Sequence, residues 1–244
     1  LEGFNIEVKE SQSLWLTRGR ANIGTGDGDL WKYNRHLHRP FKTYVLTSTG
    51  STELGYGSSE FGVDGYRCDV AGKVPTPFWD RVRRTLEREE PEVFMLAEAE
   101  EPEHHGRAFD ASYAWEFHHI TNQVAKGSMN ADSVRDYLNR EFERFPASAY
   151  RLNFITNHDE NSWNGTVAER YGDANRAMAV MCGTLFGTPL VYGGQESEMN
   201  KRLRFFEKDT IPWGDYRAMS FYRILHDLHH RHPPLFNGEF GVRP

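Results

Sequence analysis

Short apolar runs alternate with stretches of helical periodicity along most of the chain. From about residue 60 onward, five such runs are bounded by Gly, Pro or polar residues, which is the pattern of buried parallel strands. They cover residues 62–70, 92–100, 109–115, 151–157 and 188–196. Strands that alternate with helices predict an α/β fold with right-handed crossovers, either an open doubly wound sheet or part of a (β/α)8 barrel.

Four helices are predicted between and after these runs. Thr76 is the predicted cap of the first helix, with Pro77 at its first helical position, and Asp132 is the predicted cap of the second. Gly187 is predicted to close the third helix. The four helical patterns cover residues 76–91, 130–146, 173–187 and 217–232.

Residues 1–59 do not share this rhythm. They are rich in Gly, Ser and Thr, basic in the middle and only weakly periodic. We therefore expect two parts, an irregular N-terminal segment over 1–59 and an α/β domain over 60–244.

Composition and charge exclude several classes of partner. The 244 residues are 38% hydrophobic, which is enough for a real core, and 29 Lys and Arg against 35 Asp and Glu give a net charge of −6. No basic field is present to gather nucleic acid or an anionic membrane, and no stretch approaches the roughly 20 apolar residues of a membrane span. Two cysteines and an N-terminus without an apolar signal core do not fix the compartment, so secreted, periplasmic and cytoplasmic locations stay open.

Three of the five predicted strands end in a carboxylate. Asp69 closes the first run, Glu98 the second, and Asp159 directly follows the fourth. A single acid of this kind is ordinarily a helix cap or an ion-pair partner. Three acids at three strand ends favour a functional site, because in a barrel the chemistry gathers at the carboxyl ends of the strands.

An arginine accompanies the first of these acids. Strand residues two apart point the same way, so Arg67 and Asp69 are predicted to share the inner face, while Tyr66 and Cys68 point outward to the helices. Burial of two opposite charges on one face needs a compensating purpose.

These segments resemble a known family. "GVDGYRCDVA", the Glu of "EVFMLAEAE", and "FITNHDEN" look like the second, third and fourth signature segments of the α-amylase family of glycoside hydrolases, in the family's order. "TPLVYGGQE" looks like the eighth strand of the family barrel. The resemblance implies a partial (β/α)8 TIM barrel that contains strands 4–8 of the family barrel.

The resemblance also implies roles for five residues. Asp69 would be the nucleophile and Glu98 the acid/base of a retaining glycoside hydrolase, with Arg67 orienting Asp69 through charge-assisted hydrogen bonds. The apolar run before Glu98 is the kind of setting that raises a carboxyl pKa. Asp159 would bind sugar hydroxyls and stabilise the transition state, and His158 would donate a hydrogen bond to the same sugar.

Other side chains carry weaker signals. Lys73 either lines an acceptor subsite or is a solvated loop lysine, and Trp163 either stacks on a glucose ring or packs at the rim. Four residues after the third run are expected to take no part in the chemistry, namely Trp115, Glu116, His118 and His119. Four histidines are interpreted as solvated helix surface rather than metal ligands, namely His226, His229, His230 and His232.

Part of the family pattern is missing. The first signature segment, an Asp and an Asn-His pair, does not occur upstream of Asp69, and 61 residues before Gly62 are too few for three strand-helix units. We therefore expect a truncated barrel. No cofactor is evident and no metal ligand is predicted, although the resemblance allows calcium in a full-length enzyme, where the missing segment would supply part of the site.

The sequence favours a hydrolase of the α-1,4-glucosidic bonds of starch, maltodextrins or related α-glucans. Within enzymes, α-glucosidase, cyclomaltodextrinase and transglycosidase specificities stay open. A non-catalytic barrel used for binding or transporter association is the alternative from another class, and such proteins typically lose the triad that is present here. An inactive truncated fragment is a third alternative. An α-glucan is the expected partner, with no nucleic acid and no membrane, and the oligomeric state is open.

Overall fold

The computed structural model describes residues 14–16, 42–46, 64–88 and 91–237. The chain divides into two compact units. The first comprises Leu1–Tyr113 with Phe206–Lys208, and the second comprises Ala114–Phe205 with Asp209–Pro244. The predicted boundary between residues 59 and 60 lies outside the described residues.

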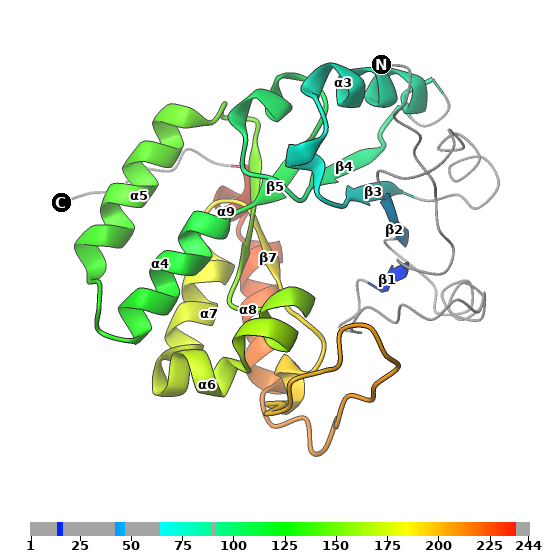
Figure 1. The fold of residues 1–244 in the computed structure, drawn as a ribbon. Helices are drawn as coiled ribbons and strands as arrows, with labels where there is room; N and C mark the ends of the chain where they lie inside the picture. The colour runs from blue at the N-terminus through cyan, green and yellow to red at the C-terminus, as the bar shows by residue number, and fades with distance from the viewer. Residues whose placement is uncertain (1–13, 17–41, 47–63, 89–90, 238–244) are drawn as a thin grey trace. The chain divides into compact units, whose positions relative to one another are not determined.

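The first unit contains a mostly parallel set of strands (Figure 1). β1 runs antiparallel to β2, and β2 to β5 pair in sequence order as parallel neighbours. The sequence predicts three of these strands, β3, β4 and β5, and the structure confirms them as shorter elements. The bounds are Leu14–Leu16 for β1, Lys42–Leu46 for β2, Gly65–Cys68 for β3, Phe94–Ala97 for β4 and Ala111–Tyr113 for β5.

One long helix, α3 (Thr76–Leu86), covers this sheet. Its buried face includes Trp79 and Leu86, which belong to the same core cluster as Tyr66 and Cys68 of β3. The outward packing expected for these two strand residues is therefore confirmed. Two short 3₁₀ helices, η1 (Ala71–Lys73) and η2 (Pro102–Gly106), follow β3 and β4.

The prediction for the start of α3 is wrong by one residue. Pro75 is the N-cap and Thr76 is already helical. The Thr76 hydroxyl bonds His104 Nδ1 at 2.9 Å, so it is not available to cap the helix. Pro77 still lies within the first two helical positions, where its missing N–H is tolerated.

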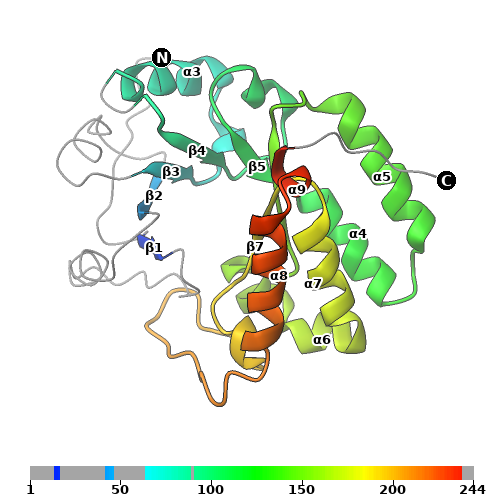
Figure 2. The same cartoon turned by 180° about the vertical axis from the view of Figure 1, so that it is seen from behind.

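The second unit holds two parallel strands, β6 (Tyr150–Phe154) and β7 (Thr188–Leu190). Both were predicted from the apolar runs. Pro189 pairs with Asn153 within β7, a place that an edge strand allows to a residue without an N–H. Figure 2 shows α7 and α8 side by side in this unit.

Helices make up most of the second unit. Three of them match predicted patterns: α5 (Ala131–Arg144), α7 (Asn175–Thr184) and α8 (Met219–Arg231). The sequence did not predict α4 (Trp115–Ala125), where the apolar pattern is weak. The remaining short elements are η3 (Glu160–Asn164), α6 (Val167–Tyr171), η4 (Gly172–Ala174), η5 (Gln195–Ser197) and α9 (Pro234–Asn237).

Two predicted helix ends are wrong in this unit. Asn130, not Asp132, caps α5, because its side chain accepts hydrogen bonds from the backbone N–H groups of Asp132 and Ser133. Asp132 instead places a negative charge in the first turn, where the helix dipole favours it. α7 ends at Thr184, and Gly187 adopts φ 129° just before β7. A Cβ there would lie 2.3 Å from the Arg151 carbonyl oxygen, so only glycine fits.

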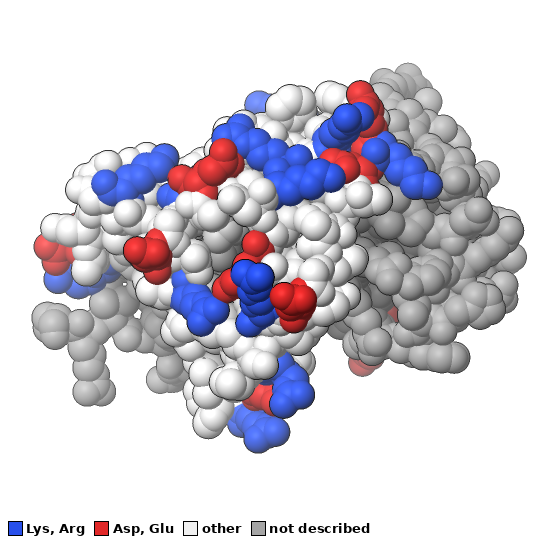
Figure 3. Space-filling model, turned by 90° about the horizontal axis from the view of Figure 1, so that it is seen from below, with Lys and Arg blue, Asp and Glu red and all other residues white. Residues whose placement is uncertain are grey.

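Three further observations concern the charged surface, the length of the helices and the cysteines. Figure 3 shows positive and negative side chains interspersed on the face that it presents. In the part of the chain that the structure describes, no helix is long and apolar enough to cross a membrane. Cys68 and Cys182 are both buried and free.

Candidate active site

Two carboxylates leave neighbouring strands of the first unit at the same end. Cys68, the last residue of β3, pairs with Ala97, the last residue of β4. Asp69 and Glu98 therefore follow directly after paired residues, and the backbone N–H of Glu98 donates to the Cys68 carbonyl at 3.0 Å. The parallel register, which the apolar runs fix, brings together two acids that lie 29 residues apart in the sequence.

A buried arginine joins the two carboxylates. Arg67 forms an ion pair with Asp69 through one terminal nitrogen, and its other terminal nitrogen lies 2.6 Å from Glu98 Oε1. The Arg67 side chain is 3% exposed, against 14% for Glu98 and 35% for Asp69. Nε of Arg67 donates to the Tyr113 hydroxyl at 3.3 Å. The guanidinium is therefore held on three sides, with Asp69 the more accessible carboxylate.

The backbone between the two acids is strained. Val70 adopts a left-handed conformation, with φ 47° and ψ 37°, which is a rare outlier for a β-branched residue. In this conformation its N–H donates to Glu98 Oε2 at 2.7 Å. Strain of this kind persists where the surrounding structure holds it and is common at functional sites.

The setting of Glu98 shifts its acidity. Burial raises the pKa of the Glu98 carboxyl, and the charge of Asp69 and a hydrogen bond with it act in the same direction. The charge of Arg67 and the Val70 N–H oppose the rise without cancelling it. Glu98 thus holds its proton to a higher pH than an exposed glutamate, as the apolar run before it predicts.

The third acid belongs to the second unit. Asp159 follows β6, and its Oδ2 lies 3.4 Å from Nε2 of His158. The His158 ring stacks on Phe205, with the ring centroids 5.8 Å apart. Trp163 also contacts Phe205, at 5.1 Å between centroids, and is 56% exposed. His158 and Trp163 thus both contact the ring of Phe205, and both are close in sequence to Asp159.

The residues with weaker sequence signals differ in exposure. Lys73 is exposed at the end of η1, and Trp163 offers an exposed ring. Trp115 packs edge-on against Phe154, with the ring centroids 5.0 Å apart. One interpretation is wrong: His229 is buried rather than solvated, because its Nδ1 lies 3.2 Å from the Gly183 carbonyl oxygen.

Sequence reasoning missed Tyr113 as a member of the site. It is the last residue of β5, buried at 3% exposure, and its hydroxyl accepts from Arg67. The signal that could have found it is its position at the end of the third predicted strand, next to the two strands that carry acids.

The described ranges hold no group of three or more His, Cys, Asp or Glu side chains that could bind a metal ion. Asp69 and Glu98 both contact the positively charged guanidinium of Arg67, which disfavours a second cation between them. Within the described ranges, this pair of acids therefore does not fit a calcium ion.

Solved structures define the class of protein. The chain resembles a maltogenic α-amylase, AmyB, from Thermotoga neapolitana, with a TM-score of 0.67 and 27% identity, over 76% of this chain and 44% of that one. It shares its fold with an α-amylase from Lactobacillus plantarum, with a TM-score of 0.68 and 23% identity, over 89% of this chain and 51% of that one. The fold is that of a TIM-barrel enzyme, represented here by part of a (β/α)8 barrel, as predicted.

The family follows from the sequence pattern of the α-amylase catalytic domain, which matches residues 54–227. The chain belongs to the α-amylase family. It is 29% identical to α-amylase MalA of Haloarcula japonica, over 71% of this chain and 26% of the relative. It is 26% identical to a cyclomaltodextrinase from a Bacillus species, over 83% of this chain and 37% of the relative. The chain thus spans between a quarter and two fifths of the length of these two relatives.

Proposed function

We propose that the protein is a retaining glycoside hydrolase of the α-amylase type that acts on α-1,4-glucosidic bonds of starch, maltodextrins or related α-glucans. The observation that carries this proposal is the pair Asp69 and Glu98 on one buried guanidinium, that of Arg67. Each carboxyl group contacts one terminal nitrogen of that guanidinium, so the two groups are neighbours. Inverting enzymes separate their carboxyl groups by about 6.5–9.5 Å to admit a water, so the adjacency favours retention.

The first step uses the difference between the two acids. Asp69, the more exposed of the two acids, attacks the anomeric carbon and forms a covalent glycosyl-enzyme. Glu98, whose pKa is raised by burial, gives its proton to the glycosidic oxygen as the bond breaks. The leaving chain departs as an alcohol, and Glu98 becomes a carboxylate.

The second step reverses these roles. Glu98, now ionised, takes a proton from a water molecule that attacks the anomeric carbon and releases Asp69. Arg67 stays charged throughout, because its guanidinium cannot lose its proton in a protein. Its fixed contacts with both carboxylates and with Tyr113 orient the two acids for both steps.

Four further residues are assigned to substrate binding. Asp159 would bind sugar hydroxyls and stabilise the oxocarbenium-like transition state, and His158 would donate to the same sugar. The exposed ring of Trp163 suits stacking on a glucose ring, and the exposed Lys73 suits an acceptor subsite. The assignments of Asp159, His158 and Lys73 are supported by the resemblance of "FITNHDEN" and "DVAGK" to family segments, and that of Trp163 by its exposed ring near Asp159 in the sequence.

The substrate class is supported by the names of the relatives, which are α-amylase, cyclomaltodextrinase and maltogenic amylase. An internal α-1,4 bond between glucose units is common to the preferred substrates starch and maltodextrin. Calcium remains a proposal for a longer polypeptide that contains this chain, and no step of the mechanism depends on it.

The test is reducing-sugar release from soluble starch and maltotriose by the chain and by any longer natural polypeptide that contains it. Asp69→Asn and Glu98→Gln should each lower the rate by at least about 10²-fold, the effect of losing one positioned acid or base. Glu116→Gln, which changes an exposed ion pair with Arg140, is the matched control. Proton NMR of the first product should show the α-anomer. An inactive wild-type polypeptide, or an initial β-anomer, would contradict the proposal.

A further inference from the structure

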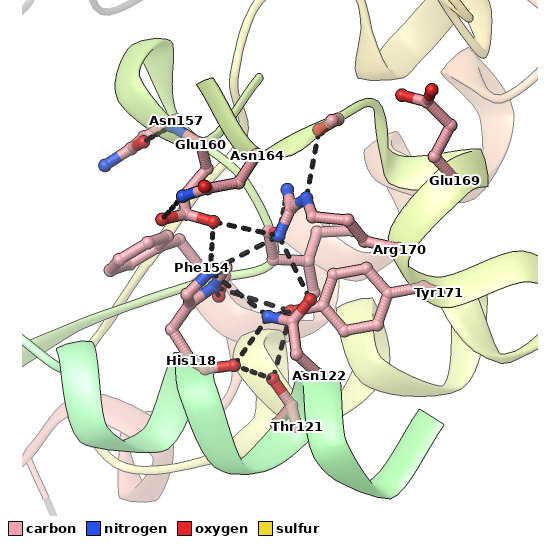
Figure 4. Close-up of polar contacts among 12 residues, drawn as sticks. His118, Thr121, Asn122, Phe154, Asn157, Glu160, Asn164, Glu169, Arg170 and Tyr171 are labelled. Carbon is pink, nitrogen blue, oxygen red and sulfur yellow. Dashed lines mark hydrogen bonds and ion pairs between the residues drawn. The ribbon is translucent and has the colours of Figure 1, made fainter. Parts of the chain in front are cut away.

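A buried polar network lies beneath the segment that carries Asp159 in the second unit (Figure 4). It joins side chains of α4, η3 and α6 with backbone carbonyls at the end of β6. Its buried side chains are His118, Thr121, Asn122, Glu160, Arg170 and Tyr171, and the exposed Asn164 joins it through Glu160. Burying so many polar groups in one place is favourable only if nearly every one of them is bonded.

Arg170 brackets the segment. Its Nε donates to the carbonyl of Gly165 at 2.9 Å, and one terminal nitrogen donates to the carbonyl of Ile155 at 2.9 Å. These carbonyls lie before and after the residues that include Asp159, so one guanidinium ties together both ends of the turn. Arg170 itself is buried, at 6% exposure.

Glu160 ties the middle of the turn to the same arginine. It directly follows Asp159, and its Oε2 lies 3.3 Å from Arg170 and 3.0 Å from Nε2 of His118. Its Oε1 accepts from Asn164 at 2.9 Å, across the π-helical turn η3. Glu160 is buried, so its side chain points into the network while that of Asp159 is 29% exposed.

Two side chains of α4, His118 and Asn122, connect the network to β6 and to Arg170. His118 Nδ1 lies 3.2 Å from the carbonyl oxygen of Phe154, the last residue of β6. Arg170 also donates to Asn122 Oδ1 at 3.3 Å. The network therefore bonds the backbone carbonyls of Phe154, Ile155 and Gly165. It also bonds the side chain of Glu160 between them.

Such an arrangement does more than add stability. A buried ion pair is weak evidence for stability, because desolvation offsets much of the Coulombic gain. Its geometric effect is stronger, because the planar guanidinium can bond two carbonyls, an amide and a carboxylate in fixed directions at once. A lysine at the same position could replace the charge but not this set of directions.

We propose that Arg170, acting with Glu160 and His118, is a positioning residue that fixes the turn 155–165 and thereby the orientation of Asp159. The catalytic part of this inference rests on the proposed function, in which Asp159 stabilises the transition state. A displacement of about 1 Å in such a group can cost on the order of 10²-fold in rate.

The first test is independent of activity. Hydrogen exchange followed by mass spectrometry should show faster exchange in peptides covering 155–165 for Arg170→Lys than for the wild type. Arg140→Lys, which alters an exposed ion pair with Glu116, is the control and should leave that segment unchanged. Unchanged exchange of 155–165 in a folded Arg170→Lys protein would overturn the proposal. If that variant does not fold, the isosteric Glu160→Gln takes its place with the same expected and opposing results.

The second test uses kinetics on maltooligosaccharides. Arg170→Lys should lower kcat by about 10- to 100-fold with KM within about two-fold, because the transition state depends on Asp159 more than ground-state binding does. In an Asp159→Asn background the same substitution should cost less than about two-fold, since the group it positions is already gone. An equal loss in both backgrounds would mean a general structural effect and would overturn the catalytic part. An inactive wild type would refute the proposed function, while the exchange result would still decide the positioning of the turn.

Discussion

Replacing Glu98 with Gln should change the pH dependence of stability in a direction that the structure fixes. The Glu98 carboxyl is 14% exposed, and burial together with the neighbouring Asp69 raises its pKa above the ordinary value of 4.5 despite the contact with Arg67. Gln has nearly the same shape as the protonated acid and cannot ionise. The substitution therefore removes a titration and keeps most of the packing.

The sign follows from proton binding. Because the pKa is higher in the folded state, the folded protein binds more protons than the unfolded chain above about pH 4.5, so the free energy of unfolding falls as pH rises through this window. Each unit by which the folded pKa exceeds the unfolded one costs about 1.4 kcal/mol at neutral pH. For a chain of this size that amounts to roughly 3–6 °C in Tm per unit. Glu98→Gln should be free of this loss.

The assay is chemical or thermal unfolding of the wild type and Glu98→Gln at intervals from pH 4 to pH 8. The difference in the free energy of unfolding should shift in favour of the variant as pH rises, and the proposed glycosidase activity should be lost. Glu116→Gln, at an exposed pair with Arg140, should change stability by no more than about 0.5 kcal/mol. A difference between Glu98→Gln and the wild type that stays constant over the whole range would refute the reasoning from burial.

Three further predictions concern backbone strain, packing and the exposed ring. Val70→Gly should raise the free energy of unfolding by up to about 1 kcal/mol, because glycine adopts the left-handed conformation without strain. The control, Val180→Gly on the exposed face of α7, should lower it by about 0.5 kcal/mol, and equal losses in both variants would contradict the prediction. Gly183→Ala should cost about 1–3 kcal/mol, measured by the shift of the denaturation midpoint, because its Cβ would lie 2.6 Å from Leu225; an unshifted midpoint would contradict the packing. Trp163→Ala should raise KM for maltooligosaccharides several-fold at unchanged stability, since the ring is 56% exposed, and an unaltered KM would exclude stacking on the sugar.

The predicted strands were the most successful part of the sequence analysis. Apolar runs bounded by breakers located β3, β4, β5, β6 and β7. β3, β5 and β6 are almost fully buried, so few polar positions interrupt their runs, whereas β7 is partly exposed. The helix ends were less successful. The Thr76 hydroxyl is bonded to His104, and Asn130 rather than Asp132 provides the cap of α5, so local propensity was overridden by contacts that depend on the fold.

The candidate residues show the same division. Asp69 and Glu98 could be selected from strand ends, and their contact with Arg67 agrees with the shared face predicted from the period of a strand. Tyr113 lies near a strand end but is not an acid, and Arg170 lies in a helix, so neither was selected. Each becomes significant only through partners 46 and 15 residues away, the guanidinium of Arg67 and the carbonyl of Ile155.

The sequence by itself determined the α/β fold class, the positions of β3 to β7 and the acids near their ends, because hydrophobic period and residue type at a strand end are local properties. Only the tertiary structure decided which groups hold those acids: the guanidinium shared by Asp69 and Glu98, the burial that raises the pKa of Glu98, and the arginine that ties the turn of Asp159. The physical reason is that burial and hydrogen bonding between distant residues are set by how the elements pack. The pattern of residues along the chain identifies each residue but does not show which distant residues come into contact.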